Sequence, residues 1–365
     1  MTRIKSLDGL RAVAIILVLF GHVSETLPLT VTKSSFYPFF LSNGGIFSDG
    51  RLGVNIFFVI SGYLITKLLI IEKQITGRIN LKYFFRRRVL RIFPVFYLYI
   101  IVLIVLKIFF IPTIFENYML VGAAALYLWN YLHLFHIHTL PSENGDWFFG
   151  HFWSLSLEEQ FYLVWPLIFI NINNRRLIKV VIAIIVITPF IRVATYFFMP
   201  GSRGQLNMML QTGGSTIFVG CLGAMLENTW FFRKKISKLI YNKSFIAATA
   251  LFLFIITHFL YGFFRGMYTV PLSTTIASLC IMVLVYWVVY VPSPIAYFLN
   301  KKIVVKIGIL SYSLYIWQQL FLTTRIHYWF NLFPQNIFLV VIVALISYYG
   351  VEEPILQLKA KFKRV

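Results

Sequence analysis

Three residues of the first apolar segment, Asp8, Arg11 and His22, have the types and the spacing for acid–base chemistry. His22 comes eleven positions after Arg11, and at about 100° per residue eleven steps return to nearly the same helix face. Asp8 lies on that face, one turn before Arg11. Imidazole titrates near neutral pH and commonly acts as a general base. The spacing therefore predicts a stripe with a proton acceptor at one end and two charges at the other.

The element that must position this stripe is a membrane-spanning helix. The stretch from Leu7 to Val23 is otherwise apolar. Ionisable side chains in hydrocarbon are costly, so they face a protein interior or a water-filled cavity. The stripe is thus expected to point inward and to be functional.

A second candidate stripe lies in the run from His151 to Tyr162. Ser154, Glu158 and Tyr162 follow one another at intervals of four, and Trp165 comes eleven residues after Ser154. These four residues share one face of a helix, whereas Glu159 is turned about 100° away. Adjacent carboxylates near a helix start partly suit the helix dipole. We expect a buried role for Glu158 and a capping or interfacial one for Glu159.

Arg88 and Arg91, spaced i, i+3, share a face just before Pro94, which is expected to open the third span. Two guanidinium groups side by side suit the bidentate capture of phosphates. The alternative is a stop-transfer cluster at the lipid headgroups. The Ser61-Gly62 pair in the second span likewise has a plain interpretation, close packing of helices through small residues.

Other residues that could bind a metal give a weaker pattern. Cys221 and Cys280 lie inside predicted spans, which argues against a disulfide or a thiolate site. Four histidines occur near one another without a carboxylate or Cys at a ligand spacing, so no metal is expected. They are His133, His136, His138 and His151.

The composition is that of an all-α, polytopic helical membrane protein. Hydrophobic residues make up 59% of the 365 residues and charged residues 12%, against about a quarter charged in soluble proteins. Apolar windows of about 20 residues recur along the chain. They predict about ten spans, at 9–28, 52–71, 93–112, 153–172, 177–196, 214–229, 240–262, 270–291, 307–330 and 337–351.

The distribution of positive charge predicts the topology. The net charge is +21, but most of the 33 Lys and Arg residues lie near one set of span ends. By the positive-inside rule both termini are cytoplasmic, and no nucleic-acid partner is implied. The outward segment 113–152 is expected to be re-entrant or interfacial. We expect a single transmembrane domain over 1–365 with no fused soluble domain.

Six motifs, in order, resemble those of the acyltransferase 3 family of integral-membrane O-acyltransferases. Each is weak alone, but the order is specific, and the resemblance covers nearly the whole chain. The motifs are Arg11 with His22, the run 58–64 (FVISGYL), the run 88–94 (RVLRIFP), the run 153–162 (WSLSLEEQFY), the run 312–315 (YSLY) and the run 352–354 (EEP). One departure stands out: members often have a His shortly after the fifth motif, where this chain has Gln318.

The resemblance implies transfer of an acyl group, acetyl from acetyl-CoA, to a hydroxyl of a cell-surface polysaccharide or lipid-linked glycan. His22 would be the general base, with acyl-His22 as an alternative, and Glu158 would orient His22 or the acceptor. Three groups of residues complete the predicted site. Asp8 and Arg11 would tune the charged half of the stripe and would contact either the coenzyme A phosphates or each other. Donor binding is assigned to Arg88, Arg91, Arg11 and Ser61, and acceptor binding to Trp153, Ser154 and Tyr162.

The same resemblance implies a multi-pass protein of the bacterial inner membrane. Its expected partners are a glycan acceptor and membrane lipids, with polysaccharide-biosynthesis proteins as possible further partners. A different class of function also fits buried His, Glu and Arg: a proton-coupled transporter or flippase of a lipid-linked glycan. Dependence on coenzyme A would distinguish the two.

Overall fold

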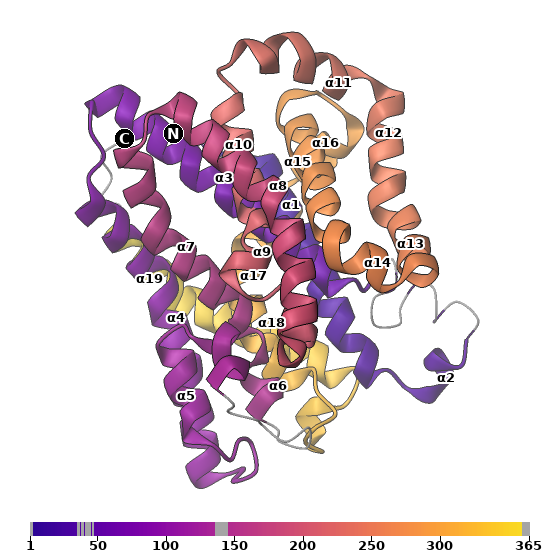
Figure 1. Cartoon of the computed structure of the whole chain (residues 1–365). Coiled ribbons are helices and arrows are strands. Elements are labelled where there is room, and N and C mark those ends of the chain that lie inside the picture. Colours follow the sequence, from indigo (N-terminus) through magenta and orange to yellow (C-terminus); the bar gives the residue numbers. More distant parts are fainter. Residues whose placement is uncertain are drawn as a thin grey trace. The chain divides into compact units, whose positions relative to one another are not determined.

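The computed structural model describes residues 3–34, 37, 40, 45, 47–135 and 145–359. Within these residues every regular element is helical and none is a strand (Figure 1). Seven helical segments are long and apolar enough to cross a membrane. The prediction of an all-α, polytopic membrane protein is confirmed. The seven segments are Lys5–Thr26, Gly50–Thr76, Leu81–Phe109, Asn174–Phe198, Lys243–Phe264, Gly266–Tyr290 and Gln335–Leu358.

The chain folds into two compact units, each made of three stretches of sequence. The first unit comprises Met1–Ile16, Arg51–Ile79 and Gln160–Ile309, and the second comprises Leu17–Gly50, Asn80–Glu159 and Leu310–Val365. Three helices divide their residues between the two units: α1 (Lys5–Val23), α7 (Phe152–Asn171) and α17 (Lys302–Phe321); a fourth, α3, gives only its first residue, Gly50, to the second unit.

The first unit is a bundle in which α8 packs on α10, and α10 and α12 both pack on α15 (Figure 1). A Cβ atom on Gly62 of α3 would overlap the carbonyl oxygen of Ile217 in α10, and one on Gly220 would overlap that of Val59. The predicted close packing at Ser61-Gly62 is therefore present. The helices of this unit are α3 (Gly50–Thr76, apart from its first residue), α8 (Asn174–Phe198), η4 (Pro200–Gln205), α9 (Leu210–Gly213), α10 (Ser215–Leu226), η5 (Phe232–Ile236), α11 (Ser237–Tyr241), α12 (Lys243–Leu251), η6 (Phe252–Ile256), α13 (Thr257–Phe264), α14 (Gly266–Tyr268), η7 (Thr269–Ser273), α15 (Thr274–Tyr290) and α16 (Pro294–Leu299).

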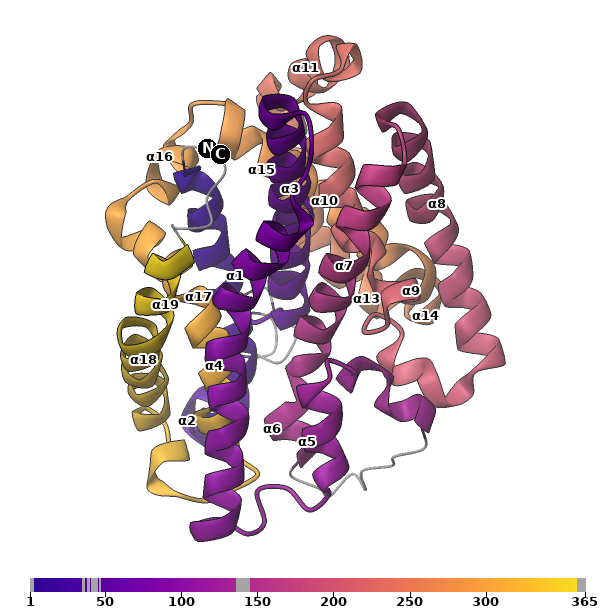
Figure 2. The same ribbon diagram turned by 90° about the vertical axis from the view of Figure 1, so that its left-hand side faces the viewer.

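In the second unit the long helix α4 packs on α19, and α5 packs on α6 (Figure 2). Buried aromatic rings fill its core, among them Phe96, Tyr99 and Phe152. The helices of this unit are η1 (Ser24–Thr26), α2 (Leu29–Thr32), α4 (Leu81–Phe109), α5 (Tyr118–Ala125), η3 (Trp129–Phe135), α6 (Gly145–Gly150), η8 (Trp329–Asn331), α18 (Gln335–Ser347), η9 (Tyr348–Glu352) and α19 (Glu353–Lys359).

Two helix boundaries lie far from the predicted span limits, the start of α4 and the end of α17, and side-chain caps explain both. Helix α4 begins at Leu81 because Asn80 caps it, accepting a hydrogen bond from the Tyr83 N–H (3.0 Å). Pro94 therefore lies inside α4 and does not open it, so that prediction is wrong. Helix α17 ends at Phe321, where the side-chain amide of Asn331 donates to the carbonyl oxygens of Leu320 (3.1 Å) and Phe321 (3.0 Å).

The three remaining predicted spans coincide with helices that are too short or too polar to be counted among the seven membrane-spanning segments. Helices α7 and α17 have 20 residues each and carry polar groups, and α10 has 12 residues. In the segment 113–152, the described residues form the short helices α5, η3 and α6. A helix of the length of α5, eight residues, reaches about 12 Å and cannot cross a bilayer alone.

Burial separates inner helices from lipid-facing ones. In α1 and α3, 61% of the apolar window is buried, whereas the value for α8 is 28%. The exposed side chains of α8 are large and apolar, for example Phe190 and Phe198, as expected for a surface in contact with lipid. The helix that carries Asp8, Arg11 and His22 is thus an inner one.

Candidate functional site

His22 stands near the end of α1, in the second unit, against two residues from distant parts of the sequence. Its Nδ1 lies 3.1 Å from Oε1 of Gln318 in α17. The Trp147 ring of α6 meets the imidazole edge-on, with the ring centroids 5.4 Å apart. The side chain of His22 is only partly buried. The imidazole is therefore fixed in place by Gln318 and Trp147 and still has some solvent-accessible surface.

A second histidine, His151, lies between α6 and α7 and is held by the next residue of α17. Oε1 of Gln319 lies 2.5 Å from Nδ1 of His151 and accepts a hydrogen bond from its backbone N–H (3.1 Å). The Trp147 indole N–H donates to the backbone carbonyl of Gln319 (2.9 Å). Burial lowers the pKa of His151 to about 3, so its ring is neutral at physiological pH. Two adjacent glutamines thus hold two histidines.

Ser154, a predicted acceptor-binding residue, belongs to the same assembly. Its hydroxyl donates to the carbonyl oxygen of His151 (3.1 Å) and lies 2.6 Å from the hydroxyl of Tyr315. Tyr315 also donates to the carbonyl of His151 (3.1 Å). Trp153, also predicted to bind the acceptor, is half-buried beside it. We call His22, Trp147, His151, Ser154, Tyr315, Gln318 and Gln319 the histidine network.

Three buried nitrogen atoms in or beside this network have no hydrogen-bond partner. They are Nε2 of Gln318, Nε2 of His151 and Nε1 of Trp317. An unsatisfied buried polar group costs about 1–3 kcal/mol, and most such groups in native proteins are paired. Gln318 is 0% exposed and His151 3%. Two of these nitrogens, those of Gln318 and His151, belong to side chains of the histidine network, and such unpaired buried polar atoms indicate a place where a polar ligand or water belongs.

The predicted phosphate-binding pair, Arg88 and Arg91, lies in α4 of the same unit, half-buried. The Arg88 guanidinium sits over the Phe84 ring, 5.7 Å from its centroid. Within the described part of the chain, Arg91 makes no hydrogen bond or ion pair, so its donors are available to an anion. Partly exposed guanidinium groups of this kind suit phosphate oxygens.

The two carboxylates of α7, those of Glu158 and Glu159, do not differ in how deeply they are buried. Glu158 and Glu159 are both half-buried, and Oε1 of Glu159 is shielded from solvent without a hydrogen-bond partner. The atom bonded to Nδ1 of His22 belongs to Gln318. The prediction that Glu158 orients His22 or the acceptor stays a prediction.

The last two motifs tie helices of the second unit together. The Tyr312 hydroxyl donates to the backbone carbonyl of Ile92 (2.6 Å), the residue that follows Arg91 in the sequence. The Ser313 hydroxyl donates to Oε2 of Glu352 (2.9 Å). Both contacts join α17, which carries Gln318 and Gln319, to α4 or η9. These motif residues position the helices of the site.

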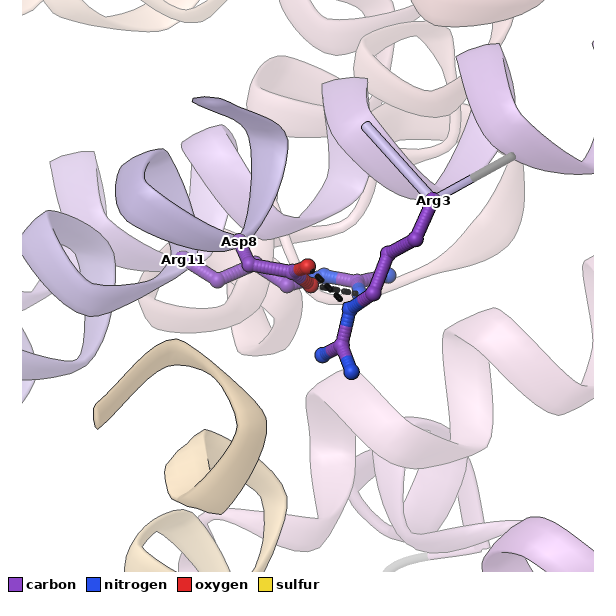
Figure 3. A network of polar contacts seen from close by, with 3 residues as sticks. All are labelled: Arg3, Asp8 and Arg11. Carbon is purple, nitrogen blue, oxygen red and sulfur yellow. Dashed lines mark hydrogen bonds and ion pairs between the residues drawn. The ribbon is translucent and has the colours of Figure 1, made fainter. Parts of the chain in front are cut away.

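In the first unit, Asp8 of α1 pairs with two arginines, Arg11 of the same helix and Arg3, which precedes it. Nε of Arg3 lies 2.5 Å from Oδ2 of Asp8, and Nη1 of Arg11 lies 3.4 Å from Oδ1 of Asp8 (Figure 3). Asp8 is 4% exposed. The prediction allowed Asp8 and Arg11 to contact either phosphates or each other, and in the structure they contact each other.

Two further predicted residues of the first unit meet across helices. The Ser61 hydroxyl of α3 hydrogen-bonds the Tyr162 hydroxyl of α7. One turn further on, the Trp165 indole N–H donates to Thr66 Oγ1 of α3 (2.9 Å). The polar stripe of α7 is therefore buried at Ser154, Tyr162 and Trp165, as its spacing indicates.

A second charged cluster of the first unit has no counterpart in the predicted site. Nζ of Lys67 lies 2.9 Å from Oε2 of Glu227 and donates to the Tyr63 hydroxyl (2.9 Å), and that hydroxyl donates to Oε1 of Glu227. Lys67 also lies over the Tyr63 ring. We call this group the Lys67 cluster.

Sequence reasoning missed His151, Gln318 and Gln319 as members of one site. The sequence did contain a signal: two adjacent glutamines inside an apolar helix, and a histidine two residues before the run 153–162. His136 and His138 of the predicted histidine group lie outside the described residues. Among the residues that are described, no three His, Cys, Asp or Glu side chains gather in a way that could hold a metal ion.

Comparison with known proteins relates the sequence of this chain to one family. The chain is 29% identical to an O-acetyltransferase, OatA, of Staphylococcus aureus over 96% of its own length and 56% of that protein. It is 35% identical to the peptidoglycan O-acetyltransferase OatA of Listeria monocytogenes over 50% of its length and 27% of that protein. It is 27% identical to a putative O-acetyltransferase of Staphylococcus aureus over 97% of its length and 57% of that protein.

The chain thus spans about half the length of the curated relatives that it matches. No solved structure matches it. A family model, described as an acyltransferase domain, matches residues 4–351, nearly the whole chain. The protein therefore belongs to the acyltransferase 3 family.

Proposed function

We propose that this chain is a membrane-embedded O-acyltransferase that moves an acyl group, acetyl from acetyl-CoA, to a hydroxyl of a cell-envelope glycan. The observation that carries the proposal is His22, an accessible imidazole on an inner helix, held by Gln318 and bordered by unmet buried nitrogens. Its relatives support the reaction class, since they are named O-acetyltransferases.

The acceptor is a sugar hydroxyl at the histidine network. Trp147 lies edge-on to His22, and aromatic rings are common stacking surfaces for sugars. One relative is named a peptidoglycan O-acetyltransferase, which makes a cell-wall glycan the first acceptor to try. His22 would take the proton of the attacking hydroxyl.

The donor is held through its phosphates by Arg88 and Arg91, with the thioester supplying the activated acyl group. The fit rests on two half-buried guanidinium groups on one helix face, of which Arg91 has no protein acceptor within the described residues. Binding from the cytoplasm follows from the topology that we infer from the charge distribution, with both termini inside and the protein in the inner membrane. The assignments of Arg11 and Ser61 to donor binding remain predictions.

The test is transfer of label from radioactive acetyl-CoA into the glycan fraction of membranes that contain this chain. Wild type and His327→Ala, which changes an exposed histidine, should incorporate label. His22→Ala should lose at least about 10²-fold in rate, in the range of general-base catalysis. Incorporation by His22→Ala at the wild-type rate would refute the assignment. If the wild-type protein acted on a lipid-linked glycan without any acyl-CoA donor, the result would favour a transporter.

A further inference from the structure

Gln318 presents two different atoms to its surroundings. Its Oε1 faces Nδ1 of His22 at 3.1 Å, while its Nε2 is buried and has no partner. An amide oxygen only accepts hydrogen bonds, and an amide NH₂ group only donates them. The contact with His22 therefore places the proton on Nδ1, and the NH₂ group of Gln318 is left to donate elsewhere.

This contact fixes the reactive form of His22. In a neutral imidazole that carries its proton on Nδ1, Nε2 bears the lone pair and is the basic atom. A base whose tautomer and ring orientation are set in advance needs no rearrangement when the hydroxyl arrives.

The unpaired NH₂ group of Gln318 indicates which kind of ligand would bind there. A buried donor beside a base calls for an oxygen acceptor, because only an acceptor removes its desolvation penalty. In acyl transfer, the carbonyl oxygen of the acyl group becomes more negative as the new bond forms, and donors aimed at it accelerate the reaction.

We propose that Gln318 both positions His22 through its carbonyl oxygen and binds the acyl carbonyl oxygen through its NH₂ group. The proposal rests on the function proposed above. The acceptor oxygen forms a bond to the acyl carbon as its proton moves to Nε2 of His22. The thioester C–S bond breaks, and the same proton passes from His22 to the departing sulfur. The protein returns to its starting state.

The neighbouring pair supplies a matched control. Gln319 holds Nδ1 of His151 with the same atom, Oε1, at 2.5 Å. A change at Gln319 should alter the tautomer of His151 and leave that of His22 in place. A general loosening of α17 would disturb both histidines alike.

The experiment combines ¹⁵N NMR of the full chain, labelled at histidine and held in lipid vesicles, with acyl-transfer kinetics. The His22 signal is assigned by its loss in His22→Ala. Wild type should show His22 protonated at Nδ1. Gln318→Met should lose this preference and lower kcat by about 10²–10³-fold. In the spectrum of Gln319→Met, the His151 signal should shift and the His22 signal should stay in place.

A third variant separates the two roles of Gln318. Gln318→Glu keeps an oxygen that faces Nδ1 but has no N–H, so it should keep the His22 tautomer and still lower kcat. A wild-type His22 protonated at Nε2, or a Gln318→Met variant with an unchanged His22 signal, would overturn the positioning role. A wild-type kcat in Gln318→Glu would overturn the carbonyl-binding role. The NMR result stands even if the chain transfers no acyl group, so failure of the proposed function is seen separately.

Discussion

The charged groups of the first unit and the histidine network of the second unit differ in how completely their polar atoms are paired. In the Lys67 cluster, both carboxylate oxygens of Glu227 are bonded, one to Lys67 and one to Tyr63. In the histidine network, the Gln318 and His151 side chains each keep an unpartnered buried nitrogen. Complete pairing is what a structural cluster needs, whereas unmet buried nitrogens indicate a ligand.

Arg192, also of the first unit, shows complete pairing in its strongest form. Its guanidinium is fully buried and donates to the carbonyl oxygens of Thr212 (2.7 Å) and Pro271 (3.2 Å) and to the hydroxyls of Ser215 (2.8 Å) and Thr275 (3.0 Å). These partners lie in η7 and in helices α9, α10 and α15. The charge is used to join helices, and burying it unpaired would be far more costly.

The comparison predicts that changes in the Lys67 cluster act on stability. Among the described residues, Lys67→Met leaves the Glu227 carboxylate buried with only tyrosine hydroxyls as partners, those of Tyr63 and Tyr290, and breaking a buried ion pair typically costs about 3–5 kcal/mol. We expect the variant to unfold at clearly lower denaturant concentration in detergent, measured by tryptophan fluorescence, with kcat of the remaining folded protein unchanged.

Two variants complete that test. Lys82→Met removes an exposed lysine of α4 and should match wild type. Lys67→Met combined with Glu227→Gln should recover part of the lost stability, because no unpaired charge stays buried. Equal stability of Lys67→Met and Lys82→Met would show that the cluster is not structural.

His151 gives the comparison a pH dependence. Its folded pKa of about 3 lies below its ordinary value of 6.5, so the unfolded chain binds a proton first as the pH falls. The stability that this group contributes is complete above pH 6.5 and is lost toward pH 3. At pH 4.5 the loss amounts to about 2–3 kcal/mol, at 1.36 kcal/mol per pH unit.

His151→Asn should therefore flatten the fall of the melting temperature between pH 7 and pH 4.5, even if the variant is less stable at neutral pH. His327→Ala, at an exposed position, should follow the wild-type curve. Parallel curves for wild type and His151→Asn would contradict a buried, neutral His151.

The smallest expected effect concerns donor binding. Arg91→Gln removes a cation that has no acceptor within the described residues, and should raise KM for the acyl donor about tenfold, or about 1.4 kcal/mol, with little change in kcat. Arg86→Gln, at an exposed position of the same helix, serves as the control. An equal change in both variants would assign the basic run to lipid headgroups.

Periodicity was sufficient to predict what lies on one helix. The burial of Ser154, Tyr162 and Trp165, the shared face of Asp8 and Arg11, and the close approach at Gly62 all follow from residue spacing and size. Glu158, the fourth member of the predicted stripe, is only half-buried, like Glu159.

What spacing cannot predict is which distant side chains meet. His22 and Gln318 are 296 residues apart, and His151 and Gln319 are 168 apart. No local pattern encodes such pairs, because they depend on how helices pack. The end of α17 could not be predicted for the same reason, because the residue that caps it, Asn331, lies beyond the helix.

The most direct test measures transfer activity and melting temperature on the same purified samples of His22→Ala and Lys67→Met. The account predicts that His22→Ala keeps the wild-type melting temperature within about 2 °C while its kcat falls at least about 10²-fold. Lys67→Met should show the reverse, a lower melting temperature with kcat retained. A His22→Ala protein that transfers acyl groups normally, or loses activity only because it unfolds, would contradict the placement of the chemistry in the histidine network.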